Sequence, residues 1–111
     1  SLRKRIANYY NKNIKNPKIK KIQYSKSCIY HQYVILTKNR KTLVKLLKKS
    51  KIQFGFHYPY AIHQLHAFKK KYGNKKFKNA EILARESISL PIDPNLSKKE
   101  LKMIVKKLNE Y

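Results

Sequence analysis

A chain of 111 residues has the size of one domain with a modest core, so we expect residues 1–111 to form a single domain. Its 41% hydrophobic content argues against intrinsic disorder, and no stretch approaches the ~20 apolar residues that span a bilayer, so we expect a soluble protein with no membrane partner. The 28 Lys and Arg residues against five Asp and Glu give a net charge of +23, which favours non-specific binding to polyanions.

The chain begins with an amphipathic pattern. Apolar residues at near-helical spacing predict a helix over residues 2–14, which must end before Pro17 because the proline ring excludes the preceding residue from a helix. Residues 16–26 are polar and predict a connection. Residues 28–36 are rich in Ile, Tyr and Val, which predicts a buried strand.

A helix and a second strand are predicted next. Asn39 is a candidate N-cap for a helix over residues 40–50, whose apolar side is supplied by leucines and a valine. Apolar and other residues then alternate over residues 52–57, which is the period of a strand. Pro59 ends that strand because it lacks the amide hydrogen that a sheet requires.

Two more helices and a short strand follow. Apolar spacing predicts a helix over residues 61–72, with Gly73 as a left-handed stop, and Asn79 is a candidate cap for the next helix. Residues 88–91 then predict a strand that Pro91 and Pro94 prevent from continuing.

The last helix has the clearest signature. Ser97 and Glu100 have the spacing of a capping box, in which each side chain accepts a hydrogen bond from the other residue's backbone amide. Four apolar residues at i, i+3, i+4 and i+7 follow. Together these elements predict an α+β fold, with helices packed on a small antiparallel sheet whose strands lie near residues 28–36, 52–57 and 88–91.

The excess of lysine has two readings. All but four of the 28 cations are Lys, whereas bidentate recognition of phosphates and bases favours Arg. The lysines also occur in every segment of the chain. We favour compositional drift with solvated lysines over a surface selected for nucleic acid.

Cysteine and histidine offer little independent chemistry. The single Cys28 suits a reducing cytosol, so a cytoplasmic location is expected, and we interpret it as a small packed residue and not a reactive thiol. His63 and His66 could share a helix face. We expect no metal site, because no Cys, Asp or Glu lies near them in the sequence to complete one.

Several short runs in a fixed order carry a more specific signal. They are Arg5-Ile6-Ala7-Asn8-Tyr9-Tyr10, Tyr30-His31-Gln32-Tyr33-Val34-Ile35, Gly55-Phe56-His57-Tyr58-Pro59, His63, Ala80-Glu81 and Ser89-Leu90-Pro91-Ile92. This order resembles the small C-terminal domain of the DegT/DnrJ/EryC1/StrS family, which comprises fold-type-I aminotransferases that aminate nucleotide-linked keto sugars. The resemblance covers about Leu2 to Leu108.

The sequence departs from the family pattern at a few positions. Lys51 stands where the family usually has Gly after a helix, and Ala61 stands where it has Pro. The common Gln after the second histidine falls on Leu65, and the usual Pro after the aromatic residue falls on Lys78. These departures affect the fine geometry of the loop from His57 to His63.

The resemblance implies a pyridoxal phosphate enzyme whose cofactor lies elsewhere. In the family, the Schiff-base lysine belongs to a larger N-terminal domain and is followed by a glycine-rich stretch. With only two glycines here, no lysine of this chain matches that role. We therefore expect the chain to begin where that larger domain ends, to be inactive alone, and to belong to a homodimer when complete.

The resemblance also suggests which residues face the substrate. We predict that His57, Tyr58 and His63 face the cleft that binds the nucleotide sugar, because a strand end followed by a proline-fixed turn presents side chains rigidly. An equally weighted alternative is that His57 and Tyr58 only satisfy loop carbonyls. For His31 and Tyr33 we favour structural packing in the strand.

Two other readings of the whole chain remain. One is a free-standing basic protein that binds RNA or DNA electrostatically, which predicts lysines grouped on one face of the fold. The other is an inactive gene fragment. The aminotransferase reading predicts lysines scattered over the surface and a polar-aromatic concavity near His57.

Overall fold

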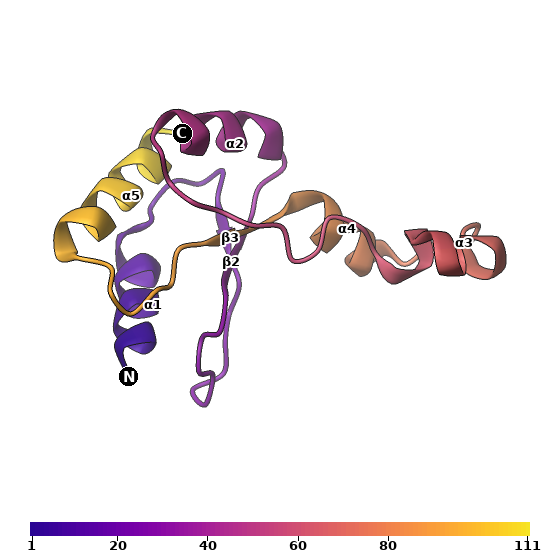
Figure 1. Cartoon of the computed structure of the whole chain (residues 1–111), viewed down its shortest axis with the longest axis horizontal. Helices are drawn as coiled ribbons and strands as arrows, with labels where there is room; N and C mark the ends of the chain where they lie inside the picture. The colour runs from indigo at the N-terminus through magenta and orange to yellow at the C-terminus, as the bar shows by residue number, and fades with distance from the viewer.

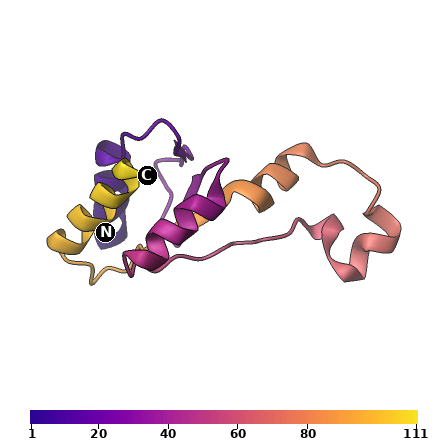
Figure 2. The ribbon, with the colours of Figure 1, turned by 90° about the horizontal axis from the view of Figure 1, so that it is seen from above.

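The computed structural model describes all 111 residues, which form a body and a projecting arm (Figure 1). The body has three helices and a three-stranded sheet: α1 (Leu2–Asn13), α2 (Arg40–Lys49), α5 (Lys98–Glu110), β1 (Lys20–Lys21), β2 (Tyr33–Leu36) and β3 (Ser87–Leu90). The arm, residues 58–83, holds the 3-10 helix η1 (Ile62–Gln64), α3 (His66–Tyr72) and most of α4 (Lys78–Glu86). It points away from α1 and α5 in both views (Figure 2). None of the helices combines the length and the apolar composition that a membrane-spanning helix needs.

The sheet confirms the predicted α+β fold. Its order is β1-β2-β3 and both pairs are antiparallel, with Lys20 opposite Leu36 and Tyr33 opposite Leu90. Every residue of β3 is buried, whereas buried and half-buried residues alternate along β2. β3 is therefore covered on both faces, although two of its four residues are serines.

Two of the predicted strands need correction. Residues 52–57 do not form a strand of the sheet, and only Gly55 forms an isolated bridge with Ser89. The remaining strand of the sheet is β1, which lies within residues 16–26, where the sequence predicts a connection. The strand predicted over residues 28–36 begins only at Tyr33, because Tyr30 has a left-handed backbone (φ 54°) that interrupts the extended run.

The helix ends were predicted with mixed success. The capping box of α5 is confirmed: the Glu100 amide donates to Ser97 Oγ (3.1 Å), and the Ser97 amide donates to Glu100 Oε2 (2.7 Å). Asn39 occupies the N-cap position of α2, but its side chain makes no capping hydrogen bond. α2 ends in a Schellman motif, in which Ile52 donates to Leu47 O (2.9 Å) and Lys51 takes the left-handed position (φ 57°).

The predictions for the arm were less accurate. The helix predicted over residues 61–72 is divided into η1 and α3, because Leu65 between them is extended. Gly73 is right-handed (φ −59°), so the predicted left-handed stop is wrong. Asn79 lies inside α4, whose N-cap is Phe77, and the Phe77 amide donates to Glu81 Oε2 (2.9 Å).

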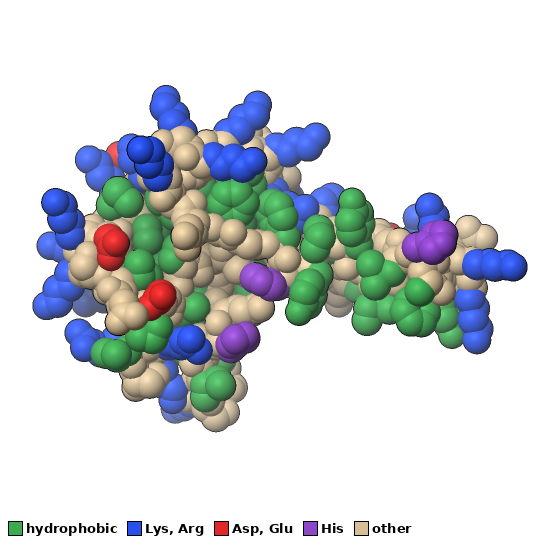
Figure 3. Space-filling model, viewed as in Figure 1, with side chains coloured by type: hydrophobic (Ala, Val, Ile, Leu, Met, Phe, Trp, Pro, Cys, Tyr) green, Lys and Arg blue, Asp and Glu red, His purple; other side chains and the backbone are tan.

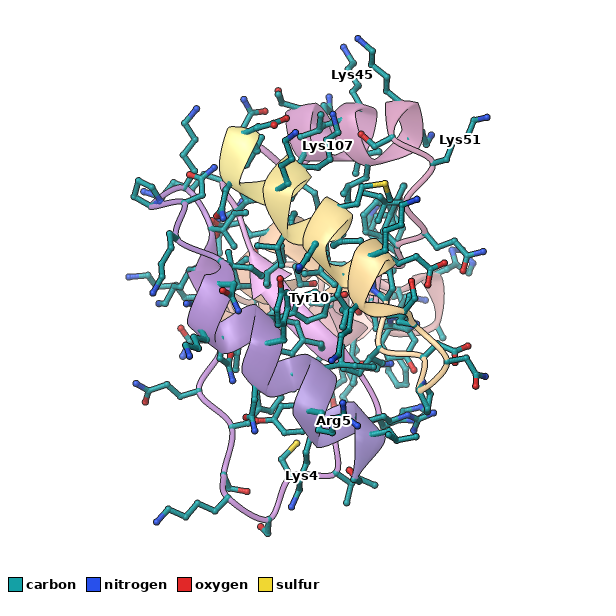
Figure 4. All side chains as sticks on the ribbon, turned by 90° about the vertical axis from the view of Figure 1, so that its left-hand side faces the viewer. Lys4, Arg5, Tyr10, Lys45, Lys51 and Lys107 are labelled. Atoms are coloured by element: carbon teal, nitrogen blue, oxygen red, sulfur yellow. The ribbon has the colours of Figure 1, made fainter.

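The hydrophobic core lies wholly in the body. Seventeen buried residues form one cluster, and none of them lies between Ile52 and Ile88. Tyr10 points from α1 into this core (Figure 4), where its hydroxyl donates to Pro91 O (2.7 Å) and its ring lies 4.9 Å from that of Tyr33. Burial raises the pKa of both phenols. The arm is thus anchored to the core only through its two ends.

Candidate functional site

The segment that precedes the arm is fixed against β3 before it reaches His57. Gly55 and Ser89 exchange two backbone hydrogen bonds, with N···O distances of 3.2 and 2.8 Å. Two residues later, the His57 ring folds back, so that Nδ1 lies 2.8 Å from the Ser89 hydroxyl. Because β3 belongs to the core, this histidine is held by the rigid part of the molecule.

The Ser89 hydroxyl determines which nitrogen of His57 carries the proton. Ser89 is 93% buried, since its exposed fraction is 7%, and His57 Nδ1 is the only hydrogen-bond partner of its hydroxyl. A buried hydroxyl needs an acceptor for its hydrogen, so we assign the donor role to Ser89. In the neutral ring the proton is then on Nε2, which is left as a free donor.

Glycine at position 55 leaves room for this position of the His57 ring. A Cβ atom built on Gly55 would lie 2.8 Å from His57 Cε1, closer than real contacts of this kind allow. A larger residue would therefore displace the imidazole from Ser89. The Tyr58 ring and the imidazole are nearly perpendicular, with ring centroids 5.7 Å apart.

His57 lines a shallow hollow of about 240 Å³ on the body. Two histidines, two glutamines and one serine supply its polar side chains, and no Lys, Arg, Asp or Glu lines it. Imidazole and amide groups both donate hydrogen bonds to neutral or anionic oxygens without a net charge of their own. In Figure 3, histidine side chains lie on the visible face near the junction of body and arm. The residues that line the hollow are His31, Gln32, Gln53, Phe54, Gly55, His57, Ser89, Leu90, Pro91 and Ile92.

The three predicted site residues do not share this hollow. Only His57 lines it, whereas Tyr58 is 72% exposed and its side chain lies outside. His63 is buried in the arm, where its Nε2 lies 3.9 Å from Glu81 Oε1 and its ring lies 4.8 Å from that of Phe77. His63 lines a second, almost wholly apolar hollow of the arm, which it shares with Phe77 and four other residues.

Sequence reasoning missed three polar residues of the hollow and assigned a fourth, His31, to strand packing. Ser89 was noted only as part of a family run, although its position in a buried strand marks it as a hydroxyl that needs a partner. Gln32 likewise stands only in a family run, and Gln53 carries no signal. His31 lies exposed in a bend and lines the hollow instead of packing in a strand, whereas Tyr33 is buried as expected.

The remaining chemistry-bearing residues are dispersed. Cys28 is half-buried and packs against the core, as expected for a small apolar residue. No three His, Cys, Asp or Glu side chains come together in a group that could hold a metal ion.

The fold is that of solved sugar aminotransferases, over about 30% of their length. The chain superposes on DesV from S. venezuelae, solved in complex with a ketimine intermediate, with a TM-score of 0.89 and 24% identity. It superposes on a DegT DnrJ EryC1 StrS aminotransferase from Brucella abortus with a TM-score of 0.86 and 26% identity. Each match covers 98% of this chain and 30% of the other.

The sequence comparisons give the same family. A sequence model of the DegT/DnrJ/EryC1/StrS aminotransferase family matches residues 1–109, and the chain belongs to this family. It is 32% identical to dTDP-3-amino-3,6-dideoxy-alpha-D-galactopyranose transaminase of Aneurinibacillus thermoaerophilus, over 98% of this chain and 30% of that protein. It is 31% identical to a pleiotropic regulatory protein of Geobacillus stearothermophilus, over 75% of this chain and 23% of that protein. The chain thus spans less than a third of these relatives.

Proposed function

We propose that residues 1–111 are the C-terminal small domain of a pyridoxal-phosphate-dependent aminotransferase that acts on nucleotide-linked keto sugars. The observation that carries this proposal is the family match over residues 1–109, combined with coverage of only about 30% of each relative. A named relative that is a transaminase of a dTDP-linked amino sugar supports the substrate class. The complete enzyme would be a cytoplasmic homodimer.

The residues of this chain do not fit the cofactor itself. Pyridoxal phosphate needs a lysine amine, an acidic partner for its ring nitrogen and donors for its phosphate. The hollow beside His57 contains neither a lysine nor a carboxylate. We therefore assign cofactor binding to the large domain, and the isolated chain is expected to be inactive.

The contribution of this chain is a rigid polar wall. The Ser89 hydroxyl holds Nδ1 of His57, so Nε2 can donate to an oxygen of the substrate, such as a sugar hydroxyl or a phosphate oxygen. Tyr58, exposed beside His57, and His63, buried farther along the arm against Phe77, are the other two residues that we propose to face the cleft. A wall of this kind orients a substrate without taking part in bond formation.

The deciding experiment is to read and express the coding region upstream of Ser1. It should encode a domain with a lysine followed by a glycine-rich stretch, and the full-length product should transaminate nucleotide-linked keto sugars. An upstream region without such a lysine would overturn the proposal. As a control, borohydride reduction of the 111-residue chain with pyridoxal phosphate should trap no stoichiometric adduct at a single lysine.

Binding to polyanions is a second property that we propose, and the net charge of +23 favours it. Lys and Arg side chains lie over both the body and the tip of the arm (Figure 3). This spread supports the aminotransferase over a free-standing protein with one dedicated nucleic-acid face.

A further inference from the structure

One groove beside α2 has cations at four of its six lining positions. This α2 groove has a volume of about 350 Å³, and none of its lining residues is Asp or Glu. Its walls are four cationic side chains and its apolar residues are a valine and a phenylalanine. The lining residues are Arg40, Lys41, Val44, Lys45, Lys48 and Phe56.

The lysines of the groove form a stripe along one side of the helix. Lys41, Lys45 and Lys48 are spaced by four and three residues, so their side chains are neighbours on the helix surface. All three are exposed, and Lys45 projects away from the body (Figure 4). Lys41 to Lys48 spans about 10 Å along the helix axis, which exceeds the reach of a single phosphate group.

Nothing within α2 relieves the repulsion between these charges. The helix contains five cations and no acidic residue. Like charges at these spacings destabilise a helix, and so do cations in its first turn, where the helix dipole is positive. Lys48 and Lys49 lie in the last turn, where the dipole favours them. A bound anion would therefore reduce the repulsion along the stripe and the penalty in the first turn.

Arg40 is held in place before any ligand arrives. Its Nη1 donates to Ala84 O (2.8 Å) and Ser87 O (3.0 Å), and its guanidinium lies 4.5 Å from the centre of the Phe56 ring. Two contacts to the end of α4 and one to an aromatic face fix the planar group, while several of its five N–H donors remain free. A fixed cation loses little entropy when an anion binds.

We propose that the α2 groove binds a run of several phosphate groups. Such a run is presented by the backbone of a single-stranded nucleic acid or by a linear inorganic polyphosphate. In both, charge repeats along a chain, as the lysines repeat along α2. This inference does not depend on the aminotransferase assignment.

The test compares two triple variants of the 111-residue chain that lose the same charge. The groove variant carries Lys41→Gln, Lys45→Gln and Lys48→Gln. The control carries Lys98→Gln, Lys102→Gln and Lys106→Gln, which form an equivalent exposed stripe on α5, a helix that also contains Glu100 and Glu110. Gln preserves helix propensity, and circular dichroism verifies that both variants fold.

The measurement is fluorescence anisotropy with labelled oligothymidine of about eight nucleotides, repeated over a range of salt concentrations. The groove variant should bind about tenfold more weakly near 0.1 M salt. The slope of a plot of log K against the logarithm of the salt concentration should become shallower by about 2, because each lost phosphate contact removes about 0.7. The control should lose clearly less. Equal losses in the two variants would overturn the proposal, because they would show that only net charge matters.

Competition identifies the source of the phosphates. Linear inorganic polyphosphate that displaces the oligonucleotide equally well per phosphate would assign the groove to phosphate chains in general. Weaker displacement, together with a loss of oligonucleotide affinity in Phe56→Leu, would assign it to nucleic acid whose bases contact the aromatic ring. If neither ligand binds the groove variant more weakly than the control, the proposed site is disproved.

Discussion

The body and the arm of this chain are stabilised in different ways. The body has a single core of 17 buried residues, which α1, α2, α5 and the sheet share. Between residues 58 and 83 only Ala61 and His63 are buried, although the arm is rich in apolar residues. Seven large hydrophobic side chains there are between 42% and 72% exposed: Tyr58, Tyr60, Ile62, Leu65, Phe68, Phe77 and Leu83.

This contrast shows that apolar content alone does not make a core. The apolar side chains of the body face one another, whereas those of the arm lie along a thin projection that has little interior. Monomeric proteins rarely expose so much contiguous apolar surface. On the proposed function, the rest of the enzyme covers the arm, so the arm should be the least stable part of the isolated chain.

Truncating one leucine in each region should show the largest difference. Leu47 of α2 is fully buried, so Leu47→Ala should cost about 2–5 kcal/mol of unfolding free energy. Leu83 of α4 is 45% exposed, so Leu83→Ala should cost less than about 1 kcal/mol. Urea denaturation followed by circular dichroism measures both. Equal costs would mean that the arm shares the cooperative core, and the comparison would fail.

Ser89→Ala tests the point where the body holds the root of the arm. The variant removes the hydrogen bond to His57 Nδ1 and should cost about 1 kcal/mol. The ¹⁵N spectrum of the His57 ring should also lose the pure Nε2–H pattern, because nothing then fixes the tautomer. Ser89→Thr retains the hydroxyl and should preserve that pattern. An unchanged ring spectrum in Ser89→Ala would contradict our assignment of the donor.

The accuracy of the sequence predictions follows the same division. Periodic apolar residues predicted α1, α2 and α5, because each buries one face in the core. The prediction of one helix over residues 61–72 was only partly correct, since Leu65 and Phe68 recur at helical spacing without a core to face. No tertiary packing holds this segment in one continuous helix. The backbone is therefore extended at Leu65, although the apolar spacing is that of a helix.

The site was predictable only where local sequence was sufficient. The run that ends at Pro59 identified His57 and its turn. The contact between Gly55 and Ser89 joins residues 34 positions apart, and a period-two pattern cannot show that this segment pairs through one bridge instead of a strand. His31 joins the hollow for a similar reason: the left-handed Tyr30 turns the chain before β2 begins.

Replacing Lys51 should stabilise the body by a smaller amount. Lys51 ends α2 in a left-handed conformation that disfavours residues with a Cβ atom, so Lys51→Gly should add about 0.5–1 kcal/mol. Lys51→Ala removes the same charge but keeps the Cβ, and it should show no comparable gain. In the arm, Gly73→Ala would place a Cβ against Lys69 O and should disturb α3 without changing the unfolding of the body. Denaturation midpoints together with hydrogen exchange separate these effects.

The smallest effect on stability should come from replacing the two glutamates whose side chains accept hydrogen bonds at helix N-termini. These are Glu100 in the body and Glu81 in the arm. Hydrogen bonds from the Ser97 backbone and hydroxyl hold the pKa of Glu100 below its usual range. A lowered pKa in the folded state means that the unfolded chain binds the proton more readily. The stabilisation is therefore complete above the ordinary glutamate pKa of about 4.3 and is lost as the pH falls through the folded value.

Glu100→Gln should accordingly flatten the decline in unfolding midpoint below about pH 5, while leaving Ser97 able to cap the helix. Glu81 accepts a hydrogen bond from the Phe77 amide, at the start of a helix that carries none of the core. Glu81→Gln should therefore leave the pH dependence of body unfolding unchanged and alter only hydrogen exchange within α4. If Glu81→Gln shifted the midpoint as much as Glu100→Gln, the arm would unfold together with the body, and the independence of the two regions would be disproved.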